Sequence, residues 1–239
     1  MRFRSSPVDE AAGTQKIGEV ARRDLSTSLG EGIAALGLSI SEQRQAQLLD
    51  YLALLHRWNR AYNLTAVRDP REMVSRHLLD SLAIAPHLIG ERLLDVGTGA
   101  GMPGMVLALA FPETLHATLL DPAAKRIRFL QEVQLRLQPA NVALVRARVE
   151  DAELAVGSFH TVTCRAFSSL AQFVASSAHL VARDGCLLAM KGERAAEEIA
   201  ALATPWRERA EVIELDVPTL AAQRYLVRLA APAAAPLRR

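Results

Sequence analysis

The spacing of apolar residues in the first third of the chain is helical. Five apolar residues recur on one helical face, namely Leu48, Leu49, Leu52, Leu55 and Trp58. This spacing predicts an amphipathic helix, and Ser41 is a suitable N-cap for its start. Residues 72–82 predict another helix, and residues 30–38 predict a short one. Together these elements predict an N-terminal helical cap over residues 29–88.

From residue 92 onward, short apolar runs alternate with helical patterns, which is typical of a parallel α/β sheet. The expected strands are residues 92–96, 115–121, 141–149, 159–166 and 186–191, and the expected helices are residues 104–111, 123–137, 170–181 and 193–202. Residues 211–217 and 224–229 predict two more strands, with no room for a helix between them. A connection this short predicts an antiparallel pair. The pattern therefore predicts a doubly wound α/β domain over residues 89–230 that is mostly parallel and closed by a C-terminal antiparallel hairpin.

Composition narrows the class of protein. Residues 1–28 are polar and mixed in charge, and residues 231–239 contain two prolines, so we expect a poorly ordered leader and a flexible tail. The formal charge of +2 is too small for a strong non-specific nucleic-acid binder. Cys164 and Cys186 form neither a disulfide framework nor a CxxC pair, which favours reduced thiols in a cytoplasmic protein. We expect no membrane-spanning segment, no secretory signal and no metal site.

A glycine-rich turn follows the strand at residues 92–96. Two interpretations of its ligand compete. Gly99-x-Gly101-x-x-Gly104 fits the dinucleotide fingerprint, in which Asp121 would hold a ribose. Asp95, however, extends the motif to Asp-x-Gly-x-Gly-x-Gly, which resembles the first motif of class I S-adenosylmethionine methyltransferases. A carboxylate here would face a pyrophosphate unfavourably and a methionine ammonium favourably, so we favour S-adenosylmethionine.

The ends of the later strands supply further candidate contacts. Asp121 can accept both ribose hydroxyls, cap the helix that follows it, or do both. The backbone of Val149 and the side chain of Glu150 can read the adenine amine, with Asp151 as the alternative. Arg165 can hold the methionine carboxylate or an RNA phosphate, or it can pair with Asp95 or Glu150. The expected cofactor-binding residues are Asp95, Gly97, Gly99, Met102, Asp121, Val149, Glu150 and Arg165.

The candidate chemistry requires no acid–base residue. The chain has no Asp-Pro-Pro-Tyr or Asn-Pro-Pro-Tyr run, the marker of exocyclic-amine methylation. Its absence fits an acceptor that already offers a lone pair, such as guanine N7. Catalysis would then rest on aligning this lone pair with the S–CH₃ bond of the donor. Arg165 would be a positioning residue. Cys164 is a possible nucleophile for pyrimidine methylation, but a small buried residue is the favoured interpretation. His77 is expected to be a helix partner of Asp80 rather than a catalytic base.

These motifs, taken together, resemble one family. They are residues 57–70, 76–82, 94–104 and 119–121, Lys125-Arg126, residues 165–167, and Lys191-Gly192. This set is similar to the bacterial small-subunit ribosomal RNA guanine-N7 methyltransferases, formerly called glucose-inhibited division protein B, over residues 30–230. The resemblance implies S-adenosylmethionine as donor, guanine N7 of 16S rRNA near the decoding region as acceptor, and a cytoplasmic monomer. Ala100 and Met102 stand where this family usually has Pro and Leu.

The expected RNA contacts are cations around the glycine turn and the helical cap. They are Arg57, Arg60, Arg76, Lys125, Arg126 and Lys191. Lys191 can equally be a solvated lysine at a strand end. Two other function classes stay open at this point, a dinucleotide-dependent oxidoreductase and a non-catalytic RNA-binding factor. The sequence also leaves open whether naked rRNA or an assembled small subunit is the substrate.

Overall fold

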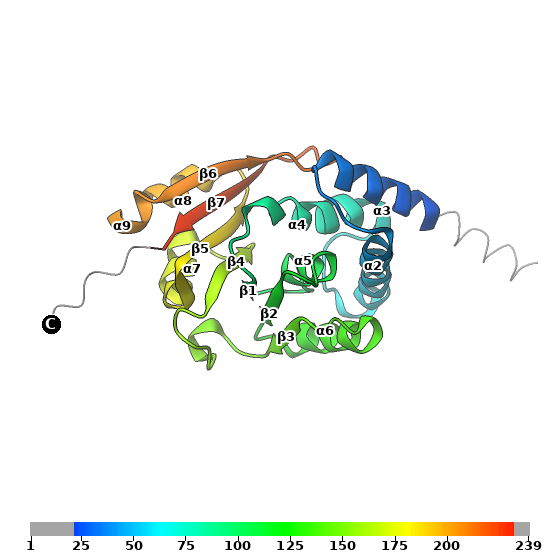
Figure 1. Ribbon diagram of the computed structural model, residues 1–239, viewed down its shortest axis with the longest axis horizontal. Coiled ribbons are helices and arrows are strands. Elements are labelled where there is room, and N and C mark those ends of the chain that lie inside the picture. The colour runs from blue at the N-terminus through cyan, green and yellow to red at the C-terminus, as the bar shows by residue number, and fades with distance from the viewer. Residues whose placement is uncertain (1–21, 232–239) are drawn as a thin grey trace, which may run out of the picture.

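The order of the strands sets the position of the site. In the computed structural model, which describes residues 22–231, seven strands form one sheet in the order β3-β2-β1-β4-β5-β7-β6 (Figure 1). The strands are β1 (Arg92–Val96), β2 (His116–Leu120), β3 (Val142–Val145), β4 (Phe159–Arg165), β5 (Val181–Lys191), β6 (Ala210–Leu215) and β7 (Arg224–Ala230). Strands β1 to β5 are parallel, and β7 runs antiparallel to both of its neighbours. The predicted doubly wound sheet with a terminal hairpin is confirmed.

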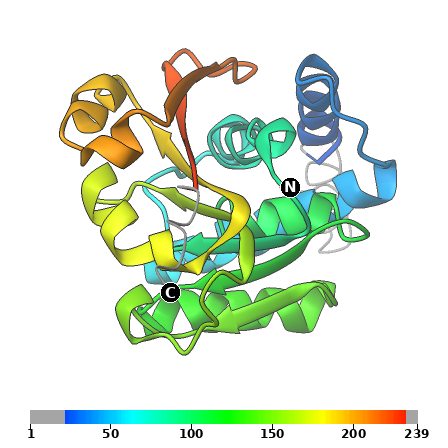
Figure 2. The same cartoon turned by 60° about the vertical axis from the view of Figure 1, so that its left-hand side comes forward.

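Helices cover both faces of this sheet. They are residues 22–35, α2 (Glu42–Tyr62), α3 (Pro70–Met73), a π-helix (Val74–Leu79), α4 (Asp80–Leu82), α5 (Gly104–Ala110), α6 (Ala124–Leu137), α7 (Leu170–Ser177), α8 (Ala195–Ala200) and α9 (Thr204–Arg207), with short 3-10 turns at Ala85–His87, Val149–Asp151 and Ala178–Leu180. In Figure 2 the N-terminal helix, in blue, lies on the right, and the segment from α7 to α9, in yellow and orange, lies on the left.

The alternation of side chains along β1 divides the core between the two faces. Leu93 belongs to a buried cluster that also contains residues of α2, α5 and α6, such as Met105 and Phe129. Leu94 belongs to a second cluster with Phe173 of α7. Successive residues of a strand point to opposite faces of the sheet. The apolar residues of the pattern Leu-Leu-Asp-Val at residues 93–96 therefore pack against the helices on both faces. Asp95 therefore lies on the α5 face, close to the start of that helix.

The N-terminal helices share their core with the sheet. The phenol of Tyr51, on α2, is fully buried and donates a hydrogen bond to the carbonyl of Ala100 in the glycine turn, at 2.7 Å. Leu29 of the first helix and Val217 of the β6–β7 connection are buried in the same cluster. The cap is thus tied both to the glycine turn and to the terminal hairpin.

The expected boundary of the leader is wrong where the structure describes it. Residues 22–28 are helical and belong to the helix over residues 22–35, which was expected only from residue 30. Leu25 packs against the core, and Arg22 pairs with Asp50 at 2.8 Å. Apolar contact with the cap stabilises a segment whose own sequence has no clear periodicity. The remainder of the expected leader, residues 1–21, and residues 232–239 of the expected tail lie outside the described residues.

Several element boundaries also differ from those expected. β3 ends at Val145, and Val149 and Glu150 lie in a 3-10 turn rather than at a strand end. β5 begins at Val181 rather than at residue 186, because residues 183–185 form a register irregularity inside a continuous strand. The helix from Leu170 ends at Ser177, and α9 was not expected. Within residues 22–231 no helix has the length and apolar character needed to cross a membrane.

The Tyr51 hydrogen bond provides a test of how the cap is attached. Tyr51→Phe keeps the ring but leaves the buried carbonyl of Ala100 without its donor. We expect the free energy of unfolding, measured by urea denaturation, to fall by about 1–2 kcal/mol. Tyr62→Phe is the matched control, because Tyr62 is 41% exposed and should change stability little. Equal stability of Tyr51→Phe and wild type would contradict the assigned role.

Candidate active site

The glycine turn lies where the strand order changes direction. β1 is flanked by β2 on one side and by β4 on the other, and ligands of doubly wound sheets bind at the carboxyl ends of strands at such a point. Gly97 has φ of +69°, and among the described residues nothing lies within 4 Å of where its Cβ would stand. Gly104 is different, since a Cβ there would collide with Leu119 and Asp95. Gly97 thus leaves room for a ligand, whereas Gly104 lets α5 pack on the sheet.

Asp95 holds the start of α5. Its carboxylate is 0% exposed, and Oδ2 accepts hydrogen bonds from the hydroxyl of Thr98 at 2.6 Å and the backbone N–H of Gly104 at 2.8 Å. Burial raises the pKa of Asp95 to about 6, although these two hydrogen bonds act in the opposite direction. Oδ1 finds no hydrogen-bond partner among residues 22–231. A buried acceptor of this kind suits a cationic or N–H donor from a ligand.

Asp121 closes the other side of the turn. Its Oδ1 accepts from the N–H of Ala123 at 2.8 Å, and its Oδ2 accepts from the N–H of Gly99 and from Arg126, both at 3.0 Å. Asp121 therefore does cap the region where α6 begins, as one of the two interpretations expected. Because it also binds the turn, this carboxylate fixes the distance between the ends of β1 and β2.

A cavity of about 300 Å³ opens beside the turn. Its lining includes the expected residues Gly97, Asp121, Val149, Glu150 and Arg165, together with Arg126, Arg148, Phe167 and Gln172. This volume lies in the range that holds small cofactors. We call this cavity the cofactor cleft.

Arg165 ends β4 at the margin of the cofactor cleft. Its Nη1 donates to Oδ2 of Asp80 at 3.0 Å and to the carbonyl of Arg76 at 3.1 Å. The alternative in which Arg165 pairs with Asp95 or Glu150 is therefore wrong. Asp80 reaches Arg165 from the helical cap, 85 residues earlier in the chain.

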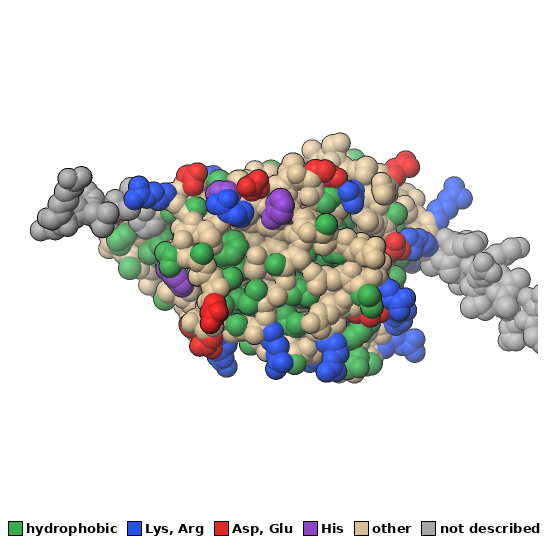
Figure 3. Space-filling model, turned by 60° about the horizontal axis from the view of Figure 1, so that its bottom comes forward, with side chains coloured by type: hydrophobic (Ala, Val, Ile, Leu, Met, Phe, Trp, Pro, Cys, Tyr) green, Lys and Arg blue, Asp and Glu red, His purple; other side chains and the backbone are tan. Residues whose placement is uncertain are grey.

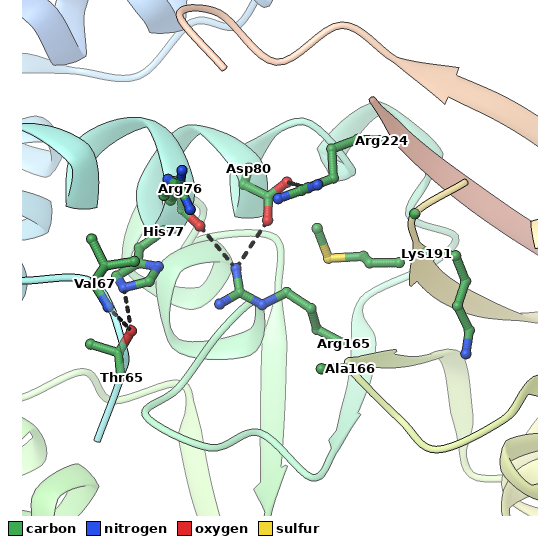
Figure 4. A pocket seen from close by; sticks show the side chains of 11 residues that line it. Thr65, Val67, Arg76, His77, Asp80, Arg165, Ala166, Lys191 and Arg224 are labelled. Carbon is green, nitrogen blue, oxygen red and sulfur yellow. Dashed lines mark hydrogen bonds and ion pairs between the residues drawn. The ribbon is translucent and has the colours of Figure 1, made fainter. Parts of the chain in front are cut away.

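A second cavity, of about 350 Å³, lies on the far side of Arg165 (Figure 4). Arg165 and Ala166 line both cavities, so the two spaces adjoin. Ala166 has φ of +57°, in the left-handed region that costs a non-glycine residue about 1–2 kcal/mol. Strained backbone of this kind gathers at functional sites. We call this space the second cavity.

The second cavity contains a buried histidine. Nε2 of His77 lies 3.0 Å from the hydroxyl of Thr65, so the expected pairing of His77 with Asp80 is wrong. Burial, together with the nearby Arg165, lowers the pKa of His77 to about 4, and its imidazole is neutral at pH 7. Cys164 is fully buried, as the favoured interpretation expected, and burial raises the pKa of its thiol.

Two of the expected contact residues, Met102 and Lys191, have side chains that contact other parts of the protein. Met102 is 6% exposed, and its sulfur lies 3.7 Å from Nη2 of Arg165. Met102 is not among the described residues that line the cofactor cleft. Its side chain contacts Arg165, and its expected contact with the cofactor stays a prediction. Lys191 lines the second cavity, but its ammonium turns to Glu198 at 2.8 Å and to the carbonyl of Phe167 at 3.3 Å. Figure 4 shows this side chain running away from Asp80 and Arg165.

The other expected RNA-facing cations are spread over the surface. Arg76 lines the second cavity and Arg126 the cofactor cleft. Lys125 is exposed on α6 beside the end of α2, and Arg60 is exposed in the last turn of α2. Arg57 lines a separate hollow between α2 and α6. On the face seen in Figure 3, Lys and Arg side chains stand singly with Asp and Glu among them, in agreement with the small formal charge.

Sequence reasoning missed Arg148 and Arg224, and it named Asp80 only as a helix partner of His77. Arg224 donates from Nε to Oδ1 of Asp80 at 3.0 Å and lines the second cavity. The register pairs Lys191 with Tyr225, which places Arg224 next to the carboxyl end of β5; the predicted hairpin did not say which of its two strands would join β5. The pairing of Asp80 had no signal either, because both of its partners are distant in sequence.

Comparisons with known proteins give one consistent result. A family model described as rRNA small subunit methyltransferase G matches residues 44–227. A protein of Methylobacillus flagellatus named ribosomal RNA small subunit methyltransferase G is 46% identical over 207 residues, 87% of this chain and 98% of that protein. The protein of the same name in Chromohalobacter salexigens is 50% identical over 201 residues, 84% of this chain and 95% of that protein. The structure of a SAM-dependent O-methyltransferase from Thermotoga maritima aligns with a TM-score of 0.50 at 14% identity, over 64% of each chain, which is a likeness of fold alone.

The raised pKa of Asp95 predicts a dependence of stability on pH. Between the ordinary value of 3.8 and about 6, the folded chain holds a proton that the unfolded chain has lost, so the stability that Asp95 contributes at low pH disappears as the pH rises through 6. Asp95→Asn removes this term. The free energy of unfolding of the variant, relative to wild type, should therefore rise by about 2–3 kcal/mol between pH 4 and pH 7 in urea titrations. Asp184→Asn, at an exposed site, is the control; a constant difference for Asp95→Asn would contradict the prediction.

Proposed function

The chain belongs to the rRNA small subunit methyltransferase G family, and on that premise we propose that it transfers a methyl group from S-adenosylmethionine to N7 of one guanine in 16S rRNA. The proposed guanine lies near the decoding region, and the proposed acting form is a cytoplasmic monomer. One observation supports S-adenosylmethionine as the methyl donor: backbone N–H groups of the glycine turn already donate hydrogen bonds to carboxylates of the protein.

In dinucleotide-binding folds, N–H groups at the start of the helix after β1 bind the pyrophosphate. In this chain the N–H of Gly104, at the start of α5, donates to Asp95, and the N–H of Gly99 donates to Asp121. Two carboxylates therefore occupy donors that a pyrophosphate would need, and their charge would repel it. This arrangement favours a nucleoside without phosphate.

The groups around the turn fit the parts of S-adenosylmethionine. The free Oδ1 of Asp95 suits the ammonium, and the open space at Gly97 suits a close approach of the ligand to the backbone. We propose that Asp121 accepts the ribose hydroxyls in place of the Arg126 N–H that it now binds. Val149 and Glu150 line the same cleft and are the proposed adenine contacts, with S-adenosylhomocysteine as the product ligand.

When bound, S-adenosylmethionine supplies a methyl group on a positively charged sulfur, which a nucleophilic lone pair can take in line. Guanine N7 carries a lone pair and no proton at neutral pH, so no side chain of this chain has to remove one. The lowered pKa of His77 makes its imidazole a weak base, and burial raises the pKa of the Cys164 thiol, so neither side chain is well suited to take a proton. The proposed role of Arg165 is to orient, because its guanidinium is fixed by Asp80 at the junction of the two cavities. Rate enhancement would then come from alignment and from exclusion of water.

The decisive experiment is to map the product. We expect the protein to transfer label from S-adenosylmethionine to unmodified 16S rRNA or small subunits, and chemical cleavage at 7-methylguanine to give a single site. Calorimetry should show binding of S-adenosylhomocysteine but not of NADH, and Asp121→Asn should weaken that binding. Absence of label from every guanine N7 would overturn the proposal, and binding of NADH would favour an oxidoreductase. Binding of rRNA without binding of S-adenosylhomocysteine would favour a non-catalytic RNA-binding factor.

The proposed RNA surface makes a separate prediction about salt. Each cation that meets a phosphate releases about one counterion, so Arg60→Ala, Arg76→Ala and Lys125→Ala should each reduce the slope of log binding constant against log salt by about 1. Arg183→Ala is the matched control, because Arg183 is exposed near the amino end of β5, at the opposite edge of the sheet. Unchanged slopes for the first three variants would remove this surface from the RNA contact.

A further inference from the structure

The second cavity is walled by segments that are far apart in the sequence, from Thr65 to Arg224. Thr65 and Val67 come from the segment after α2, and His77 and Asp80 from the cap helices. Met190 and Gly192 come from the end of β5, and Arg224 from the start of β7. Since Arg165 and Ala166 also line the cofactor cleft, a group bound here would lie beside whatever occupies that cleft.

Asp80 organises the polar side of this cavity (Figure 4). It is 2% exposed, and each of its oxygens accepts from a different arginine at 3.0 Å, Oδ2 from Arg165 and Oδ1 from Arg224. Arg224 uses Nε for Asp80 and Nη1 for the carbonyl of Gln223 at 3.3 Å. Because a guanidinium has donors at all three nitrogens and no acceptor, the Nη2 of Arg224 keeps donors for a ligand.

The rest of the lining is small and partly apolar. Val67, Met190, Ala166 and Gly192 offer surfaces against which a flat ring can pack. Among the described residues, nothing lies within 4 Å of where a Cβ of Gly192 would stand. The volume of about 350 Å³ falls within the range of sites for small ligands. A cavity with donors at one edge and apolar walls suits an aromatic base whose exposed edge carries acceptors.

The chemistry of the donors distinguishes between the two purines. Guanine presents two adjacent acceptors, N7 and O6, on one edge, whereas adenine presents the acceptor N7 beside an amino donor. A guanidinium held by Asp80 can donate to O6 of guanine, but it would face the adenine amino group donor to donor. The cavity therefore favours guanine over adenine on its N7 edge.

We propose that the second cavity receives the acceptor guanine itself, swung out of the RNA stack, and that Arg224, held in place by Asp80, donates to its O6. This inference rests on the proposed function and deepens it by naming the site and the residue that select the base. N7 then faces the junction at Arg165 and Ala166. Enzymes that modify a base commonly extrude it into such a pocket.

Gly192 provides a direct way to block the cavity. The space beyond its Cα is open, and its φ lies outside the left-handed region, so Gly192→Phe should fold and fill the cavity. We expect rRNA methylation to fall at least ~100-fold, while binding of S-adenosylhomocysteine and of rRNA stays within about threefold of wild type. Ala53→Phe is the matched control, because Ala53 is exposed and lines the separate hollow near Arg57. Wild-type methylation by Gly192→Phe would overturn the proposal.

The extrusion of the base has its own readout. With 2-aminopurine in place of the mapped guanine, unstacking raises its fluorescence. We expect the 2-aminopurine fluorescence to rise when wild-type protein binds this RNA in the presence of S-adenosylhomocysteine. We expect no rise in fluorescence with Gly192→Phe at a saturating protein concentration. A rise of equal size with both proteins would show that the base goes elsewhere.

The contact with O6 can be isolated because 2-aminopurine keeps N7 and lacks O6. We expect wild type to methylate the substituted RNA about 10–100-fold more slowly than the natural one, and Arg224→Met to lose a similar factor on guanine. Both changes remove the same hydrogen bond. The methylation rate of Arg224→Met on the 2-aminopurine RNA should therefore be little lower than its rate on the natural RNA. Losses that multiply would overturn the role of Arg224. If wild type methylates no guanine N7, the proposed function itself fails; if it does but Gly192→Phe is unaffected, only this inference fails.

Discussion

Two buried carboxylates hold the glycine turn, and the site depends on their hydrogen bonds to backbone N–H groups. Asp95 binds the N–H of Gly104, and Asp121 binds the N–H groups of Gly99 and Ala123. Each link joins the end of one strand to the start of the next helix or to the neighbouring strand's turn. Buried anions are tolerated here because oriented N–H donors stabilise them. These bonds also support the proposed choice of a ligand without phosphate, since they occupy donors that would otherwise attract phosphate.

A third buried carboxylate, Asp80, plays the corresponding part for the other half of the site. It joins the helical cap to β4 through Arg165 and to β7 through Arg224. Breaking a buried pair by removing one partner is costly, because it leaves a charge without compensation in a dry environment. The cap, the central strands and the terminal hairpin are thus tied at a single point, and this point lies between the two cavities.

The sequence was most informative where local pattern and chain order act alone. Apolar runs and glycine spacing were enough for the parallel strands, the terminal hairpin and the turn at Gly97, but not for the order of the strands in the sheet. Contacts between distant segments were not accessible in this way. The partners of Asp80, the hydrogen bond from Tyr51 and the turning of Lys191 toward Glu198 each depend on how elements pack in space. The helix over residues 22–35 was missed at its start for the same reason, because contact with the cap, rather than local periodicity, holds residues 22–28 in place.

The separation of 144 residues between Asp80 and Arg224 has a consequence for how the molecule matures. During synthesis from the N-terminus, the cap and the glycine turn emerge first, and β7 must still insert between β5 and β6. Until that strand docks, Asp80 lacks one of its two cations and the second cavity lacks a wall. The residues that line the cofactor cleft all lie between Val96 and Gln172. If the second cavity receives the acceptor base, as proposed, competence for that base depends on β7, the last strand to be made.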